Sequence, residues 1–227
     1  MPPARGYQSP NDLPGRIPVF PLHGCILLPR ASLPLNIFEP RYLAMLDDVI
    51  RGDRIIGMIQ PTGEGGETGS PTDRAAPLCA VGCAGRITSF QELEDGRLLI
   101  SLGGIARFAL LDEAQVSAPY RVFSVDYRRF AQDFVHGAGE DLVDRDRLIE
   151  VLRRYLEANN LEADWRAIGR SSVEQLVNSL SIASPFGCSE KQALLEARDL
   201  QARAETLIAL AEMDLAASTG TAGNTLQ

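Results

Sequence analysis

The hydrophobic period of this 227-residue chain changes near residue 140, and this change limits the fold more than any other feature. Before it, short apolar runs alternate with Gly- and Pro-rich turns, which is typical of β-strands. After it, apolar residues recur three and four positions apart, as on one face of a helix. The chain is therefore predicted to be α+β, with a closed or nearly closed β-barrel over residues 17–130 and a helical subdomain over residues 140–216.

One helix is expected within the barrel, because Tyr42, Met45, Leu46 and Val49 share one face of the segment Arg41–Arg51. The expected strands are Ile17–Leu22, Ser32–Phe38, Arg54–Gln60, Leu78–Phe90, Arg97–Leu102, Ile105–Leu111 and Tyr120–Tyr127. Tight turns are predicted at Asp95-Gly96 and Gly103-Gly104. Pro18 and Pro21 indicate an edge strand or a bulge, since proline cannot donate to a β-ladder.

The second half is predicted to hold several helices, the first with Leu148, Val151, Leu152 and Tyr155 on one face. Two capping boxes, Ser171 with Glu174 and Ser189 with Gln192, are expected to open two more helices, the second of them the longest. Residues 1–16 are expected to form a flexible lead-in, residues 61–77 an exposed loop and residues 217–227 a disordered tail.

The charge balance argues against nucleic acid as a partner. Thirty acidic and 22 basic residues give a net charge of −8, whereas phosphate backbones are bound by clustered Lys and Arg. No apolar run reaches the length of a membrane-spanning helix, and the first residues have no apolar core of a secretory signal. A cytoplasmic protein with no membrane partner is therefore expected.

Catalytic and cofactor motifs are sparse. The sequence has no G-x-x-x-x-G-K-[ST], H-E-x-x-H or G-x-S-x-G, and its four cysteines lack zinc-site spacing, so neither a metal nor a cofactor is expected. The sharpest enzymatic alternative is a small hydrolase that uses Cys25 and His23, since residues i and i+2 of a strand share a face. The structural alternative is a surface histidine and a packed thiol.

Three motifs occur in order along the chain. The first comprises Pro18–Leu22 (PVFPL), Leu33–Leu35 (LPL) and Ile37–Tyr42 (IFEPRY). The second comprises Val81–Ile87 (VGCAGRI), Asp95–Arg97 (DGR) and Gly104–Phe108 (GIARF), and the third is Glu190–Glu196 (EKQALLE). Together they resemble the N-terminal substrate-binding domain of Lon proteases over roughly residues 17–215. Leu28-Pro29-Arg30 departs from the Phe-Pro-Gly of many relatives, and His23 replaces a residue that is often Arg.

The resemblance implies a PUA-like pseudo-β-barrel with one embedded helix, followed by a C-terminal helical bundle that ends in a long helix. It also implies a non-catalytic module that binds unfolded polypeptides or exposed apolar segments, because the ATPase and protease modules of full-length Lon proteases would begin near Gln227, where this chain ends. An ATP-dependent protease or a chaperone is a partner consistent with the resemblance. The oligomeric state, and the choice between an adaptor and a holdase, stay open.

A small-molecule-binding domain is a second alternative, because the same fold family includes cereblon-like proteins. Their ligand pocket, however, belongs to a separate zinc-bearing domain that this chain lacks.

Two modes of polypeptide binding are consistent with the layout. An extended segment could add to the edge strand marked by Pro18 and Pro21. Alternatively, an apolar side chain could enter a groove between barrel and helices. The candidate lining of that groove is Phe20, Leu22, Phe38 and Phe108. Together with the motif residues at the start of the predicted helix, the candidate binding residues are Phe20, Leu22, Phe38, Glu39, Arg41, Tyr42 and Phe108. For these motif residues a scaffold role is the alternative, with Phe38 and Tyr42 in the core and Glu39 at a helix start.

Overall fold

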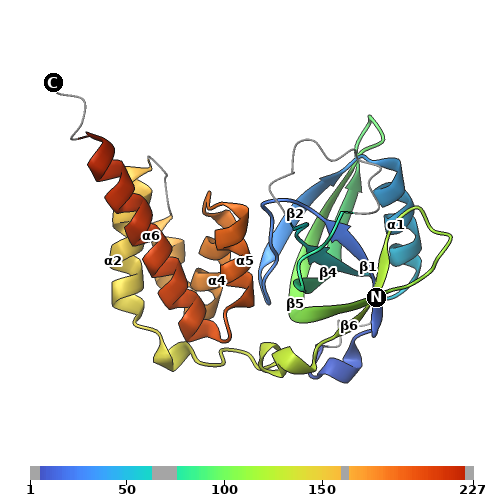
Figure 1. The fold of residues 1–227 in the computed structure, drawn as a ribbon, viewed down its shortest axis with the longest axis horizontal. Helices are drawn as coiled ribbons and strands as arrows, with labels where there is room; N and C mark the ends of the chain where they lie inside the picture. Colours follow the sequence, from blue (N-terminus) through green and yellow to red (C-terminus); the bar gives the residue numbers. More distant parts are fainter. Residues whose placement is uncertain (1–5, 63–75, 160–163, 223–227) are drawn as a thin grey trace.

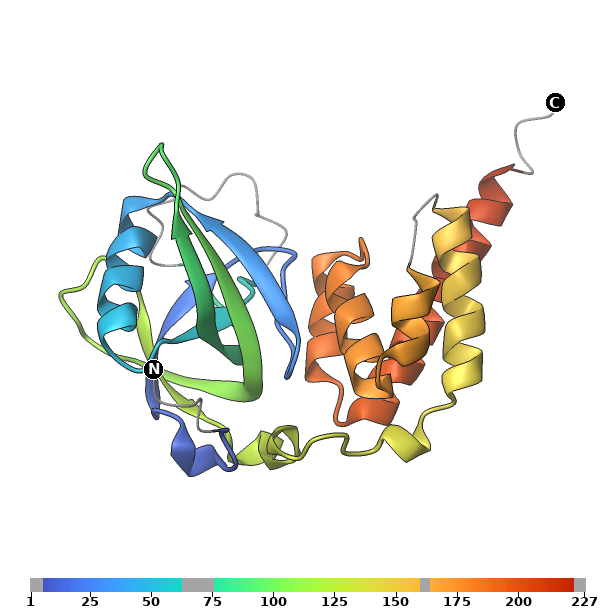
Figure 2. The ribbon, with the colours of Figure 1, turned by 180° about the vertical axis from the view of Figure 1, so that it is seen from behind.

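A β-barrel and a helical region lie side by side and are joined at one end by a segment of short turns (Figures 1 and 2). The computed structural model describes residues 6–62, 76–159 and 164–222. The chain is α+β, as the change of hydrophobic period predicts. Within the described ranges, no helix combines the length and the apolar content that crossing a membrane requires.

Five strands close into the barrel, and a sixth strand, β2, pairs with one of them. Their order is β2-β5-β4-β3-β1-β6, and pairing of β5 with β6 completes a ring. The long strand β5 uses one edge for two partners, because its first part pairs with β2 and its last part with β6. The strands are β1 (Arg16–Pro21), β2 (Ser32–Ile37), β3 (Ile55–Ile59), β4 (Val81–Glu92), β5 (Leu98–Glu113) and β6 (Val122–Asp126).

Strand β1 is not the edge strand that its prolines predict. It lies between β3, with which it runs parallel, and β6, with which it runs antiparallel. The residues that follow the prolines supply the amide donors: the Val19 N–H donates to the Arg121 carbonyl and the Leu22 N–H to the Ile59 carbonyl, both at 3.0 Å. Both prolines therefore fit inside the ring without leaving a donor unmatched.

The predicted turn at Gly103-Gly104 is also wrong, because β5 continues through both glycines. A Cβ on Gly104 would collide with the Leu28 carbonyl, so this glycine permits close approach of the chain that precedes β2. The turn at Asp95-Gly96 is confirmed, with Gly96 at a φ of +80° and its N–H donating to Leu93.

The open edge of the sheet belongs to β2, which, among the strands of the described residues, pairs with β5 alone. Its burial alternates, with Leu33, Leu35 and Ile37 inside and the residues between them exposed. The Gly104 N–H donates to the Ala31 carbonyl, and this register directs the main-chain groups of Ser32, Pro34 and Asn36 away from β5. Pro34 lacks an N–H, which limits uncontrolled pairing at this edge.

Helix α1 (Pro40–Arg51) packs across one end of the barrel (Figure 1). Its buried residues are the predicted four, Tyr42, Met45, Leu46 and Val49. Pro40 occupies the first turn, where its missing N–H costs nothing, and Gly52 ends the helix. The sequence pattern is therefore confirmed here.

Three 3₁₀ turns and five further α-helices complete the described part of the chain. The turns are η1 (Pro10–Asp12), η2 (Arg128–Phe134) and η3 (Glu140–Leu142), and the helices are α2 (Arg145–Ala158), α3 (Trp165–Arg170), α4 (Val173–Ala183), α5 (Cys188–Glu196) and α6 (Leu200–Ala222). Helix α2 buries the four residues expected from its period, and α2, α4 and α5 all pack against α6.

Both predicted capping boxes differ in the structure. Helix α4 is capped one residue later than expected, by Ser172, whose hydroxyl accepts from the Gln175 N–H. Glu174 is thereby freed to pair with Arg30. Helix α5 begins after Gly187, one residue before Ser189, and Gln192 bonds with Gln60 and Val81 of the barrel instead.

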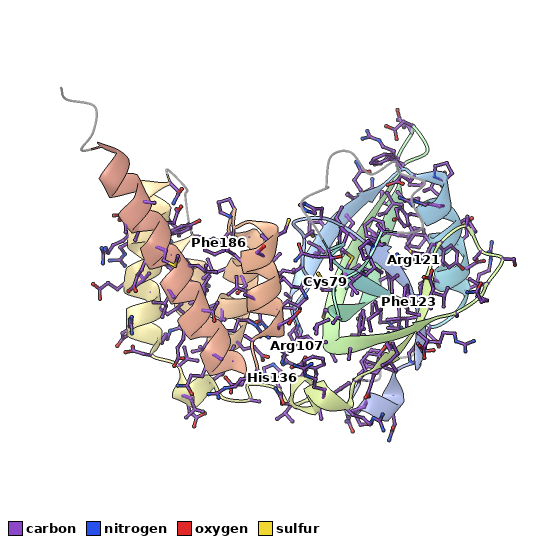
Figure 3. All side chains as sticks on the ribbon, viewed as in Figure 1. Cys79, Arg107, Arg121, Phe123, His136 and Phe186 are labelled. Carbon is purple, nitrogen blue, oxygen red and sulfur yellow. The ribbon has the colours of Figure 1, made fainter. Side chains whose placement is uncertain are left out.

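The expected long final helix is divided into α5 and α6. Asp199 opens α6, since its carboxylate accepts from the Ala202 N–H at 2.8 Å. The buried Arg107 of β5 donates to the carbonyls of Leu195 and Ala197 at the end of α5. Figure 3 shows Arg107 between the barrel and the helical region.

The two halves share one hydrophobic core, which runs from Phe20 and Tyr42 in the barrel to Leu207 in α6. A second cluster fills the other part of the barrel around Phe108. The chain before β1 contributes to this second cluster, because Leu13 is buried and Tyr7 packs against the cluster, although a flexible lead-in is expected there.

Helix α6 reaches Ala222, beyond the expected start of the tail at residue 217. Most of the expected loop at residues 61–77 lies outside the described residues.

Candidate functional site

In the structure, His23 contacts a different thiol from its predicted partner Cys25. His23 and Gly24 form a turn, with Gly24 at a φ of +68°, so the same-face rule for strands does not apply. The His23 ring instead contacts Cys188 at the start of α5, with Nδ1 3.0 Å from Sγ. The contact that the structure shows for His23 therefore supports a pairing with Cys188 and not the predicted Cys25–His23 pair.

Burial raises the pKa of the Cys25 thiol, and it raises that of the fully buried Cys83 further. A raised pKa leaves little thiolate at neutral pH, and the thiolate is the reactive form. In the described part of the chain, no group of three or more His, Cys, Asp or Glu side chains is arranged to hold a metal ion.

We expect alkylation with iodoacetamide to follow this burial. At neutral pH, Cys83 should stay unmodified until the protein unfolds, and Cys25 should react slowly and faster as the pH rises toward its raised pKa. Site-resolved mass spectrometry measures both rates, with half-buried Cys188 as internal reference. Rapid alkylation of Cys25 at neutral pH that is lost in the His23→Ala variant would restore the nucleophile hypothesis.

The predicted apolar groove does not form, because its residues occupy different surroundings. Phe108 is fully buried inside the barrel, where Gly57 and Gly82 lack the Cβ atoms that would collide with its ring. Phe20 is buried against Tyr42, with ring centroids 4.3 Å apart, and Leu22 is half-buried at the main core. Phe20 and Phe108 therefore hold the scaffold together and are not available to a ligand, whereas Leu22 stays partly accessible.

Two charged residues extend the Phe20–Tyr42 pair to the surface at the start of α1. The Arg41 guanidinium lies 4.5 Å above the Tyr42 ring and pairs with Glu39 at 2.9 Å. Both charged side chains are partly exposed. They form a charged rim next to Phe38, whose side chain, expected in the core, is 63% exposed.

Further exposed apolar side chains gather at the same end of the sheet. Leu99 is 42% exposed and pairs with Asn36 of β2. Phe90, on the other strand that flanks β5, is 59% exposed, but it pairs with buried Ile100 and therefore lies on the opposite face of the sheet from Leu99. We call the open edge of β2, from Ser32 to Ile37, together with Phe38 and Leu99, the edge surface. Neighbouring exposed apolar side chains of this kind are typical of an interaction site.

The prediction from sequence includes Phe38 of the edge surface but misses Leu99, and it also misses the exposure of Phe90 on the opposite face. For Leu99 a signal exists, because Ile100 and Leu102 sit in the barrel interior and period-two alternation places Leu99 outside. Phe90 follows a bulge between Ile87 and Ser89 that shifts the pairing of β4 with β5. Period-two alternation along β4 therefore does not predict the exposure of Phe90.

The matched relatives are full-length proteases of which this chain spans about a quarter. It is 28% identical over 209 residues to Lon protease 2 of Myxococcus xanthus, covering 90% of this chain and 24% of that protein. It is also 28% identical over 204 residues to Lon protease of Flavobacterium johnsoniae, covering 87% of this chain and 24% of that protein.

Two solved structures have a similar fold. One is a Lon N-terminal domain protein from Xanthomonas campestris, with a TM-score of 0.59 and 24% identity, covering 86% of this chain and 97% of that chain. The other is the N-terminal domain of a Mycobacterium avium complex Lon protease, with a TM-score of 0.64 and 16% identity, covering 87% of this chain and 98% of that chain. The model of the ATP-dependent protease La (LON) substrate-binding domain matches residues 16–212, nearly the whole chain. The chain therefore belongs to the family of LON substrate-binding domains.

Proposed function

We propose that this domain binds extended, apolar polypeptide segments at the edge surface and performs no catalysis itself. The observation that carries the proposal is the open edge of β2 with exposed Phe38 and Leu99 beside it. Ser32 and Asn36 present main-chain groups that an added strand would pair with, and the apolar side chains would give it contact area. The substrate-binding description of the family is consistent with this use.

The strand to which a polypeptide would add is therefore β2, and not β1 as expected from the sequence. An unfolded polypeptide is the occupant that fits best, because it has unpaired backbone groups and exposed apolar side chains together, whereas a folded partner has satisfied most of both. We also assign the barrel to the PUA-like class and the helical region to a bundle, which the closed ring of strands and the packing on α6 support.

The test is a titration with reduced, carboxymethylated α-lactalbumin, which stays unfolded, with native α-lactalbumin as the folded control. We expect saturable binding of the unfolded form only. The double variant Phe38→Ser/Leu99→Ser should weaken binding about tenfold, from the lost burial of two apolar side chains.

The matched control is Leu142→Ser, since Leu142 is 61% exposed but lies on η3, outside the edge surface. It should leave the affinity unchanged. Absence of binding at high micromolar concentration, or equal weakening by the control and the double variant, would contradict the proposal.

A further inference from the structure

A cavity of about 350 Å³ lies where the barrel, the connecting turns and the helical region meet. It is separate from the edge surface, and its wall includes four arginines from four different places in the chain: Arg30, Arg107, Arg198 and Arg203. This concentration is unusual in a chain with a net charge of −8.

Three of these arginines are paired with carboxylates of the same wall. Arg107 pairs with Asp133 at 2.8 Å, and Arg198 pairs with the adjacent Asp199 at 3.1 Å. Arg30 pairs with Glu174. Each carboxylate is thereby neutralised by one guanidinium.

Arg203 differs, because it forms no ion pair among the described residues although it is only 4% exposed. Its Nε donates to the Leu194 carbonyl and its Nη1 to Asn178 Oδ1, both at 2.9 Å. Its Nη2 is buried and, in the described ranges, is the sole buried side-chain nitrogen or oxygen without a hydrogen-bond partner. Leaving a buried cation unpaired is strongly unfavourable, so an anion is expected to stabilise this position.

Arg203 stays charged at neutral pH. Burial, and then the neighbouring charge of Arg107, lower its pKa to about 10, which is still well above neutrality. One positive charge on the wall is therefore in excess, and it is the charge of Arg203.

We propose that this cavity binds a monoanionic carboxylate through the guanidinium of Arg203. A carboxylate oxygen accepts a charge-assisted hydrogen bond from Nη2, which supplies the missing partner. A single negative charge balances the excess on the wall, whereas a dianion would leave one negative charge uncompensated there. The volume is at the lower end of the range of ligand sites and fits a small acid or the end of a polypeptide.

Access to Nη2 requires a small opening of the wall. The side chain of Arg198 is 82% exposed, so it can be displaced with little loss of packing. A carboxylate held there would touch the barrel, η2 and the start of α6 at once, and would strengthen the contact between the two halves.

The test is a titration of the ¹⁵N-labelled protein with sodium acetate, with sodium chloride keeping the ionic strength constant. We expect saturable shifts of the Gly139 and Leu200 amides, which line the cavity, and of the Arg203 Nε–H. Arg203→Met should weaken acetate binding about tenfold or more. Arg170→Met, at an exposed arginine of α3, is the control and should bind as the wild type does.

Equal binding to Arg203→Met and wild type would overturn the proposal. Should Arg203→Met fail to fold, the wild-type titration still decides: shifts confined to the cavity support the site, and absent, scattered or unsaturable shifts refute it. Because the readout residues lie outside the edge surface, this outcome is independent of polypeptide binding there.

Two sources of the carboxylate are distinguished with alanine tripeptides. A free-acid tripeptide that binds more tightly than acetate indicates the C-terminus of a polypeptide, whereas equal affinities indicate a free small acid. Binding of the C-terminally amidated tripeptide as tightly as the free acid would contradict recognition of a carboxylate.

Discussion

Replacing Asp133 with alanine is expected to lower the free energy of unfolding by about 3–5 kcal/mol. Asp133 and Arg107 form a buried pair, with side chains 6% and 1% exposed. Asp133 accepts from the Arg107 backbone N–H as well as from Nε and Nη2. Without the carboxylate, a buried guanidinium between barrel and helices loses its counter-charge, and this uncompensated charge causes most of the loss.

Denaturant unfolding of wild type and variant measures this loss. The matched control is Asp126→Ala, because Asp126 also pairs with an arginine, Arg128, whose side chain is 83% exposed. That surface pair should contribute far less to stability than the buried pair, because solvent screens it. Similar losses in the two variants would show that the Arg107–Asp133 pair does not hold the two halves together.

Replacing Phe108 with alanine is expected to cost about 3–5 kcal/mol. Its ring is fully buried in the barrel and fills the space left by Gly57 and Gly82. The strands that carry these glycines are held in register by the ladders of β3, β4 and β5, so the cavity cannot close by local collapse.

The control for this prediction is Phe90→Ala, since Phe90 is 59% exposed on β4. It should change the free energy of unfolding by no more than about 0.5 kcal/mol. If Phe108→Ala were as mild as Phe90→Ala, the assignment of Phe108 to the barrel core, in place of a binding groove, would be wrong.

Local periodicity predicts the elements well where one face alone is buried. The four core residues of α1 and the four of α2 follow from helical spacing, and the alternation in β2 follows from period two. In each of these elements, the side chains that are buried follow from the spacing of apolar residues within the element itself. The local sequence is therefore enough to predict them.

The errors arise where a residue serves a distant partner. Gly104 has the features of a turn residue, but its role is to let the Leu28 carbonyl approach β5. Glu174 fits a capping box, but it pairs with Arg30, 144 positions away. Gln192 likewise bonds across to Gln60, 132 positions away. A single sequence does not show such long-range pairs, and the site at Arg203 depends entirely on them.

The candidate binding residues illustrate the same limit. Phe20, Phe38 and Phe108 are equivalent in hydrophobicity, yet only Phe38 is exposed. Its exposure depends on the end of β2 and the start of α1, where the chain leaves the sheet. The barrel closure that buries Phe108 is a property of strand order, which periodicity does not determine.

Hydrogen exchange at the open edge of β2 tests the central claim most directly. We expect the backbone amides of Ser32 and Asn36 to exchange freely in the unbound protein and to become protected when unfolded α-lactalbumin is bound, because an added strand would pair with them. The amide of Leu35, directed toward β5, serves as the reference and should change little. Binding that leaves the Ser32 and Asn36 exchange rates unchanged would contradict strand addition at this edge.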